Sequence, residues 1–229
     1  MPGLELASFS LAMAADACFR RIAYPDGLSV LVSESSTELS HMIGVRAVMP
    51  RVELEQILAH VSAPEFAWTT GRHTSYPTVD VETASIPWLD ELLQPHLRDT
   101  LLPTLAEVFR VDAAHLLLRD SFVIKYTAAD GADGRPPEEQ EKHEANSPRA
   151  QPGLKSHFDE SCFSFILQLN PLADFTGGGT KFAHASGALS VAPGEAMCFC
   201  GFNFHEGVAI LSGEHALAIQ PTDLVHPLP

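Results

Sequence analysis

The stretch that decides the fold is SHFDESCFSFILQLNP, residues 156–171. It opens with a histidine and a carboxylate two positions apart, His157 and Asp159, and continues into a mainly apolar run at 163–169. The run ends at Asn170 and Pro171, and a short apolar run bounded by turn residues is typical of a buried strand. On a strand, residues 157 and 159 project to the same face, which places an imidazole beside a carboxylate.

Further strand-like segments lie on both sides of this stretch. Residues 116–126 (LLLRDSFVIKY) end in a pattern of period two, with Phe122, Ile124 and Tyr126 on one face. More short segments with strand character follow, separated by glycine and proline turns, at 154, 179–183, 189–191, 196–202, 206–211 and 216–220. Many short strands at this spacing indicate a sandwich or barrel.

The first half of the chain is mixed in character. Short strands are expected at 27–33 and 45–49, and residues 51–61 (RVELEQILAHV) carry the apolar spacing of an amphipathic helix. A leucine-rich helical stretch at 88–110 contains Pro95 and Pro103, which should split or kink it. The prediction is an α+β fold in which a helical and mixed support region, residues 1–115, precedes a jelly-roll-like domain at 116–221. Residues 127–152, rich in proline, glutamate and glycine, are expected to form a mobile loop.

Composition excludes several classes of protein. The 229 residues include 14 basic and 29 acidic side chains, a net charge of −15, and a field this negative repels nucleic acid. No apolar run approaches the roughly 20 residues of a membrane span. The acids Glu5 and Asp16 make the N-terminus a poor signal peptide, and the four cysteines show no Cys-x-x-Cys spacing. We therefore expect a cytoplasmic protein without nucleic-acid or membrane partners.

The most specific chemistry resides in His157, Asp159 and His205. Two imidazoles and one carboxylate on one face of an octahedral metal are the 2-His-1-carboxylate triad of non-haem Fe(II) oxygenases, which leaves three coordination positions open. A His-x-Asp pattern alone also occurs in solvated strand ends with an unrelated core histidine, so the surrounding motifs decide between the two interpretations.

Those motifs occur in order along the chain: FVIKY (122–126), the His-x-Asp pair, SFILQLN (164–170), DFTGGGTKF (174–182), PGEAMCF (193–199) and HEG (205–207). Together they resemble the Fe(II)/2-oxoglutarate-dependent dioxygenases of the prolyl 4-hydroxylase and procollagen-lysine hydroxylase type. The resemblance implies a double-stranded β-helix, or jelly roll, braced by N-terminal helices. It also implies that His157, Asp159 and His205 are the catalytic iron ligands.

The resemblance further implies the cosubstrate site. Tyr126 is matched to a 2-oxoglutarate contact and Thr180 to a residue that lines the cosubstrate. The family usually has Arg or Lys ten residues after the distal histidine, and this chain has His215 there. We expect His215 to bind the far carboxylate of 2-oxoglutarate as an imidazolium.

The implied reaction is hydroxylation of a C–H bond with release of succinate and CO2, and ascorbate is the expected reductant. The substrate would be prolyl or lysyl side chains of a protein or peptide, or a small molecule. Two alternatives stay open at this point. The chain could be a catalytically altered or inactive jelly roll that binds a metal or ligand, or a cupin-like metalloenzyme that does not use 2-oxoglutarate.

Overall fold

The computed structural model describes residues 19–33, 36–70, 78–118, 121–128, 151–159, 161–213, 217–221 and 224–225. Over these residues the chain has the expected α+β class, and the paired strands run antiparallel. The expected loop at 127–152 falls largely outside the described residues.

The helices lie in the first half of the chain. They are α1 (Arg51–Val61), α2 (Pro87–His96), the π-helical turn η3 (Leu97–Leu101) and α3 (Leu102–Phe109). Short 3-10 turns are η1 (Leu39–His41), η2 (Thr83–Ser85), η4 (Ala113–His115) and η5 (Leu172–Asp174).

The largest sheet among the described residues has its strands in the order β1 (Phe19–Ala23), β2 (Ser29–Ser33), β3 (Ile43–Ala47), β13 (Glu195–Cys200), β9 (Phe163–Gln168), β16 (Leu217–Pro221), β7 (Ser121–Lys125), β5 (Val79–Glu82) and β4 (Thr69–Thr70). Strand β17 (Leu224–Val225) pairs with β9 and with β6 (Leu117–Leu118). A smaller sheet has the order β12 (Ala188–Leu189), β11 (Thr180–Phe182), β14 (His205–Gly207) and β8 (Leu154–His157). Strands β10 (Phe175–Gly177) and β15 (Ile210–Gly213) pair with each other.

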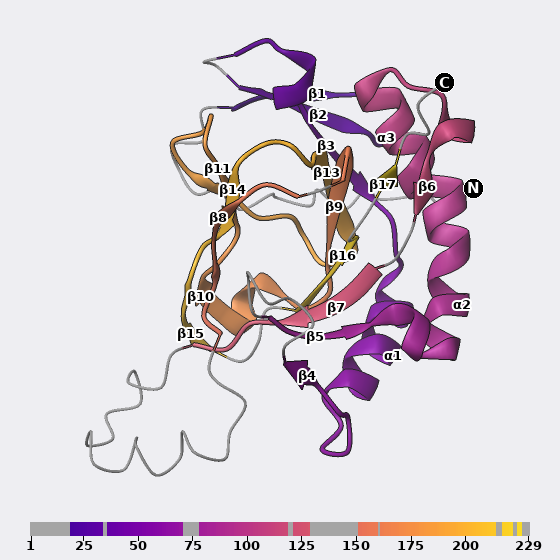
Figure 1. Cartoon of the computed structure of the whole chain (residues 1–229), viewed down its shortest axis with the longest axis vertical. Coiled ribbons are helices and arrows are strands. Elements are labelled where there is room, and N and C mark those ends of the chain that lie inside the picture. Colours follow the sequence, from indigo (N-terminus) through magenta and orange to yellow (C-terminus); the bar gives the residue numbers. More distant parts are fainter. Residues whose placement is uncertain are drawn as a thin grey trace, which may run out of the picture.

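The large sheet is the middle layer of the molecule, with helices on one side and the smaller sheets on the other (Figure 1). Strand alternation explains both contacts. On β13, Ala196 and Cys198 face the helical leucines, whereas Met197 and Phe199 face Phe182 of the smaller sheet. The sheet is therefore apolar on both faces, as expected for a buried middle layer.

Close approach of α3 to the sheet depends on Gly44 of β3. A Cβ built at residue 44 would lie 2.6 Å from Cγ2 of Val108, which leaves no space for a larger side chain. The glycine lets the helix pack directly on the strand that pairs with β13.

The prolines of the long helical stretch change its helix type. The sequence predicted a split or a kink, and the π-helical turn η3 divides the stretch from Pro87 to Phe109 into α2 and α3. The N–H of Leu102 bonds the carbonyl of Leu97 across this wider turn. The turn ends two residues before Pro103, whose ring would clash with the carbonyl four residues earlier in a regular α-helix.

The N-terminal strands are integral to the large sheet. Strand β3 pairs with β13 along Ala47 to Gly44, and β5 pairs with β7. The division of the chain at residue 115 stays a prediction. None of the helices in the described part of the chain is long and apolar enough to cross a membrane.

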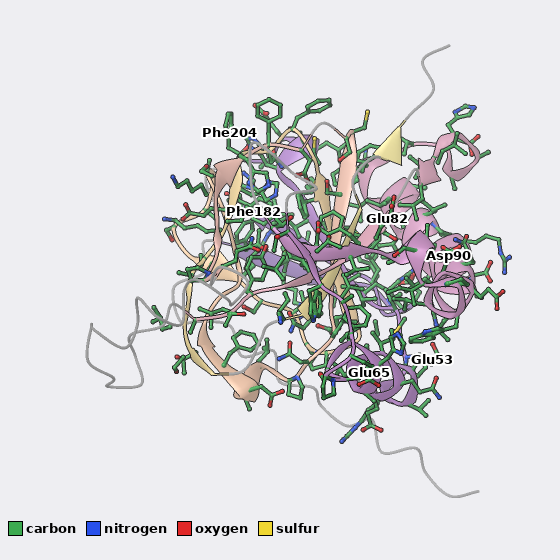
Figure 2. All side chains as sticks on the ribbon, turned by 60° about the horizontal axis from the view of Figure 1, so that its bottom comes forward. Glu53, Glu65, Glu82, Asp90, Phe182 and Phe204 are labelled. Carbon is green, nitrogen blue, oxygen red and sulfur yellow. The ribbon has the colours of Figure 1, made fainter. Side chains whose placement is uncertain are left out.

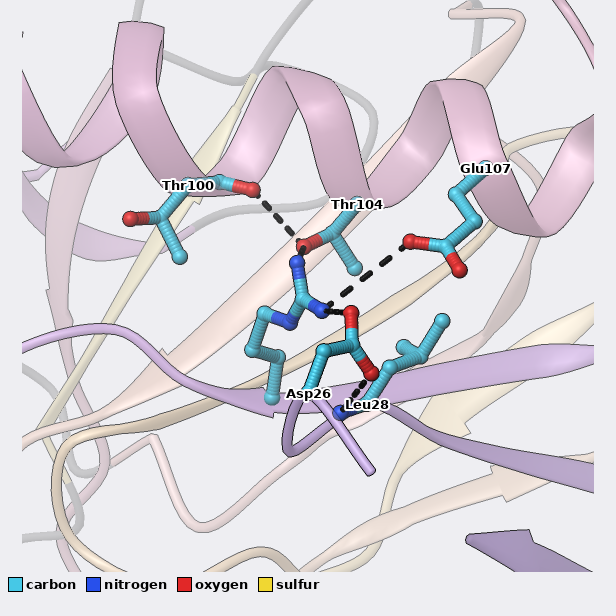
Figure 3. A network of polar contacts seen from close by, with 6 residues as sticks. Asp26, Leu28, Thr100, Thr104 and Glu107 are labelled. Carbon is cyan, nitrogen blue, oxygen red and sulfur yellow. Dashed lines mark hydrogen bonds and ion pairs between the residues drawn. The ribbon is translucent and has the colours of Figure 1, made fainter. Parts of the chain in front are cut away.

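Arg46 on β3 links the sheet to α3 and to the turn between β1 and β2. Figure 3 labels its partners Asp26, Thr104 and Glu107. Its guanidinium contacts the Asp26 carboxylate, lies 3.9 Å from Glu107 Oε2 and donates to Thr104 Oγ1 at 3.4 Å. The Arg46 side chain is 16% exposed, so its charge is mostly removed from water and relies on these partners.

We expect Arg46→Met to lower the melting temperature by about 2–4 °C, because Met keeps the apolar stem and leaves the acids unpaired. The matched control is Arg98→Met, since Arg98 pairs with Asp99 on an open surface with 71% of its side chain exposed. Thermal unfolding followed by circular dichroism measures both. An equal loss in the two variants would contradict a special role for Arg46.

Candidate metal centre

The two histidines of the site come from neighbouring strands of the smaller sheet. His157 is the last residue of β8 and His205 is the first residue of β14, and the register pairs them directly. Their ring centroids are 4.4 Å apart. Directly opposed residues of an antiparallel pair share one face, so both imidazoles project to the same side.

Each imidazole is anchored through its Nδ1 atom. His157 Nδ1 lies 2.8 Å from the carbonyl of Lys155, and His205 Nδ1 lies 2.9 Å from the carbonyl of Asn203. A carbonyl oxygen can only accept, so Nδ1 carries the hydrogen in both rings. With the hydrogen on Nδ1, Nε2 is the ring nitrogen that can bind a metal, and such hydrogen bonds at Nδ1 commonly orient metal-ligating histidines.

Asp159 completes the cluster from the turn after β8. Its Oδ1 atom lies 3.5 Å from His157 Nε2 and 3.8 Å from His205 Nε2. One ligand atom from each of the three residues falls within 4.8 Å of the others. The structure therefore brings together the three predicted iron ligands.

The charges of the cluster fit a divalent cation. Burial alone would raise the pKa of Asp159, but hydrogen bonds from His157 and Ser164 and attraction by both imidazoles hold it below its usual value. Burial lowers the pKa of His205, and attraction by Asp159 offsets this only in part. A carboxylate and a neutral imidazole, the forms that ligate metals, are thus favoured at these two positions.

His157 behaves differently and makes metal binding depend on pH. Burial would lower its pKa, but the hydrogen bonds to Asp159 and the Lys155 carbonyl, with attraction by Asp159, raise it. A proton on His157 competes with the metal for Nε2. Metal affinity should therefore fall as the pH decreases through the raised pKa of His157, which lies above the usual value of about 6.5.

This dependence is measurable by anaerobic competition of Fe(II) between the protein and a chromophoric chelator at several pH values. Constant affinity from about pH 8 down to about pH 6 would contradict the proton competition at His157.

A pocket between the large and the smaller sheet extends from the two histidines. Tyr126 and Thr180, both predicted from the sequence, line it together with His157 and His205. Its other walls are mainly apolar, formed by Leu154, Ile166, Phe175, Leu189, Val191, Met197, Val208 and Ile210. A small polar ligand could reach the metal centre here while largely removed from water.

Lys and Arg do not occur among the described residues that line this pocket. Lys181 points outward from β11, with its Nζ atom 3.6 Å from Glu206 Oε1 at the surface. Lys125 lies over the Trp68 ring at 4.9 Å. His215, the predicted partner of the far carboxylate, lies outside the described residues.

Sequence reasoning missed four polar residues of the site. Gln168 and Ser190 line the pocket, Ser164 donates a hydrogen bond to Asp159, and Ser161 hydrogen-bonds Ser164. Alternation on β9 could have found two of them, because Ser164, Ile166 and Gln168 share one face of that strand. None of these serines is a candidate nucleophile, because the chain lacks the Gly-x-Ser-x-Gly motif of a nucleophile elbow.

No family model matches the chain, and no curated protein matches it. Solved structures do match the chain. The non-heme alpha ketoglutarate dependent epimerase SnoN from nogalamycin biosynthesis is 14% identical, with a TM-score of 0.52 over 78% of this chain and 74% of SnoN. EvdO2 from Micromonospora carbonacea var. aurantiaca is 10% identical, with a TM-score of 0.52 over 82% of this chain and 89% of EvdO2.

The chain has the fold of the Fe(II)/2-oxoglutarate oxygenases. A prolyl-4-hydroxylase from Pseudomonas putida is a weaker match, 11% identical with a TM-score of 0.44 over 79% of this chain and 92% of the enzyme. At such low identities the likeness concerns the oxygenase fold alone. Substrate and reaction have to be argued from the residues of this chain.

Proposed function

We propose that the protein is an Fe(II)- and 2-oxoglutarate-dependent dioxygenase that hydroxylates a C–H bond and releases succinate and CO2. One observation carries the proposal. Two imidazoles anchored through Nδ1 and one carboxylate converge within 4.8 Å, at the end of a largely apolar pocket. Such a triad leaves three metal positions for a bidentate oxo acid and O2.

Iron, when bound, supplies the activation of O2 that couples decarboxylation of 2-oxoglutarate to oxidation of the substrate. His157, Asp159 and His205 would hold it. The hydroxyls of Tyr126 and Thr180 would bind and orient the cosubstrate as hydrogen-bond donors. The apolar walls would exclude water from the reacting atoms, which strengthens each polar contact in the pocket.

The finer features of the fold belong to the same proposal. We propose that the two facing sheets form a double-stranded β-helix, and that residues 116–221 contribute its main part with residues 1–115 as support. The pocket between the sheets supports this arrangement, since it lies where a jelly roll holds its ligand. Prolyl or lysyl side chains of a peptide, or a small molecule, are the proposed substrates, with ascorbate as reductant.

An anaerobic titration tests the proposal directly. Fe(II) followed by 2-oxoglutarate should produce a visible metal-to-ligand charge-transfer band, and admission of O2 should release succinate. Iron binding without the band would favour a different metalloenzyme or a binding protein. The band without succinate, even with candidate substrates present, would favour a catalytically altered jelly roll.

His215 gives the cosubstrate site a distinctive pH dependence. If its imidazolium pairs with the far carboxylate, affinity for 2-oxoglutarate falls as the pH rises through the titration of His215, because the neutral ring loses the attraction. The variant His215→Arg should bind 2-oxoglutarate more tightly and without this dependence, since arginine stays charged. The charge-transfer band measures both affinities, and identical pH profiles would exclude His215 as the partner.

A further inference from the structure

Two buried serines form a hydrogen-bond chain that ends on the carboxylate of the metal centre. Ser164 lies on β9 and Ser161 in the turn before it, and each is 1% exposed. The Ser164 hydroxyl donates to Asp159 Oδ2, and the Oγ atoms of Ser161 and Ser164 are 2.9 Å apart. Neither residue is one of the three ligands, so their presence in the interior calls for a separate explanation.

The direction of this hydrogen-bond chain follows from counting protons. A serine hydroxyl has a single hydrogen, and Ser164 gives its hydrogen to the carboxylate, which can only accept. Ser164 must then accept from Ser161. The order is Ser161 to Ser164 to Asp159, with every hydrogen bond pointing toward the negative charge.

The chain makes the two carboxylate oxygens of Asp159 inequivalent. Oδ2 is held by Ser164, whereas Oδ1 faces His157 Nε2 at 3.5 Å and His205 Nε2 at 3.8 Å. The backbone N–H of Asp159 also donates to the carbonyl of Gly201 at 2.8 Å. Both ends of the residue are thereby fixed, and the carboxylate cannot rotate without breaking a charge-assisted hydrogen bond.

Gly201 makes room for this arrangement. A Cβ at residue 201 would overlap the carbonyl oxygen of Ser161 and lie 2.8 Å from its Oγ. The N–H of Gly201 donates to the carbonyl of Cys162 at 3.0 Å, which ties the end of β13 to the serine turn. The turn with Ser161 is therefore packed tightly against the strand end that also holds the Asp159 backbone.

We propose, on the basis of the function proposed above, that Ser164 and Ser161 are positioning residues that make Asp159 bind the metal through Oδ1 alone. A carboxylate bound through both oxygens would occupy a fourth metal position. Only two would then remain for a bidentate oxo acid and O2 together, instead of three. The serines thus keep the third open position available.

Ser164→Ala is the direct test, with Ser161→Ala as the second variant and Ser121→Ala as the matched control. Ser121 is also buried, at 3% exposed, and hydrogen-bonds Thr83 away from the triad. Co(II) is the probe, because its visible spectrum reports coordination number. Affinity is measured by competition with a chelator, and the melting temperature is recorded without metal.

We expect Ser164→Ala to weaken Co(II) binding by about 10- to 100-fold, the usual effect of losing a ligand's hydrogen-bond partner. Its Co(II) spectrum should also change. Ser161→Ala should show a smaller change of the same kind. Ser121→Ala should leave affinity and spectrum unchanged even where its melting temperature falls, and Ser164→Cys, which keeps a weak donor of similar shape, should recover part of the affinity.

Wild-type affinity and spectrum in both Ser164→Ala and Ser161→Ala would overturn the positioning role while leaving the triad intact. If Ser164→Ala does not fold, Ser161→Ala and Ser164→Cys decide the question by the same two measurements. A wild-type protein that binds Co(II) but gives no charge-transfer band with Fe(II) and 2-oxoglutarate would instead refute the proposed function. The two failures are therefore distinguishable.

Discussion

Replacement of His205 by alanine should abolish tight binding of Fe(II). His205 supplies one of three ligands, and its side chain is 7% exposed at the centre of the cluster. Without it, one imidazole and one carboxylate remain, and a pair of ligands does not hold a labile divalent metal well. The loss of Fe(II) affinity should exceed the roughly 10- to 100-fold loss that is typical when a ligand loses its hydrogen-bond partner.

The same result is expected for His157→Ala, measured by anaerobic Fe(II) titration against a competing chelator. His115→Ala is the matched control, since His115 lies exposed on η4 in the first half of the chain. It should bind iron like the wild type. If His157→Ala or His205→Ala kept wild-type affinity and turnover, the triad would not be the metal centre.

Replacement of Phe182 by alanine should cause the largest loss of stability near the site. Phe182 is fully buried, lies 5.1 Å from the Phe199 ring and 6.0 Å from the His205 ring, and pairs with His205 across β11 and β14. Truncating a buried phenylalanine removes its burial and leaves a cavity, at a cost of about 3–5 kcal/mol. The metal affinity should fall as well, because the cavity lets the His205 ring move.

Phe204→Ala is the control for this prediction. Phe204 precedes His205 directly but is 53% exposed, and Figure 2 shows it at the periphery while Phe182 lies inside. Its replacement should change the free energy of unfolding by no more than about 0.5 kcal/mol, as is usual for surface positions. Urea unfolding measures both variants, and equal losses would mean that the Phe182 cavity is not the cause.

The sequence predicted those helices and strands in which the apolar residues alone mark the buried positions. The helix predicted at 51–61 matches α1, and the mainly apolar run at 163–169 matches β9 within one residue. The first segment carries an apolar stripe of helical period, and the second is a short apolar run bounded by turn residues. The convergence of His157, Asp159 and His205 was predictable because their types, spacing and neighbouring motifs all indicated one chemistry.

Other elements escaped prediction because polar residues occupy interior positions. Strand β5 (VDVE) alternates valine with acids, and its Asp80 is fully buried. The sequence of this segment therefore does not indicate a buried strand. The segment expected as one strand at 206–211 is also different in the structure. It forms the two strands β14 and β15, which lie in different sheets and are separated by Val208 and Ala209.

Alternation places Ser164 on the same face of β9 as Ile166 and Gln168, but the hydrogen bonds of Ser161 and Ser164 could not be predicted. They depend on hydrogen-bond geometry across a turn, and residue spacing carries no information about that geometry.

The order of strands in the large sheet has a consequence for synthesis of the protein. Strand β3 ends at Ala47, yet its partner β13 ends only at Cys200. The two strands can therefore pair only after most of the chain has been synthesised. Until then the three paired strands β1, β2 and β3 expose the open edge of β3 and the side chains of β2, which are buried in the folded protein. Pairing between such distant segments is slow, and it leaves the nascent chain prone to aggregation. We therefore expect its yield in cells to depend on chaperones that cover the N-terminal strands during translation.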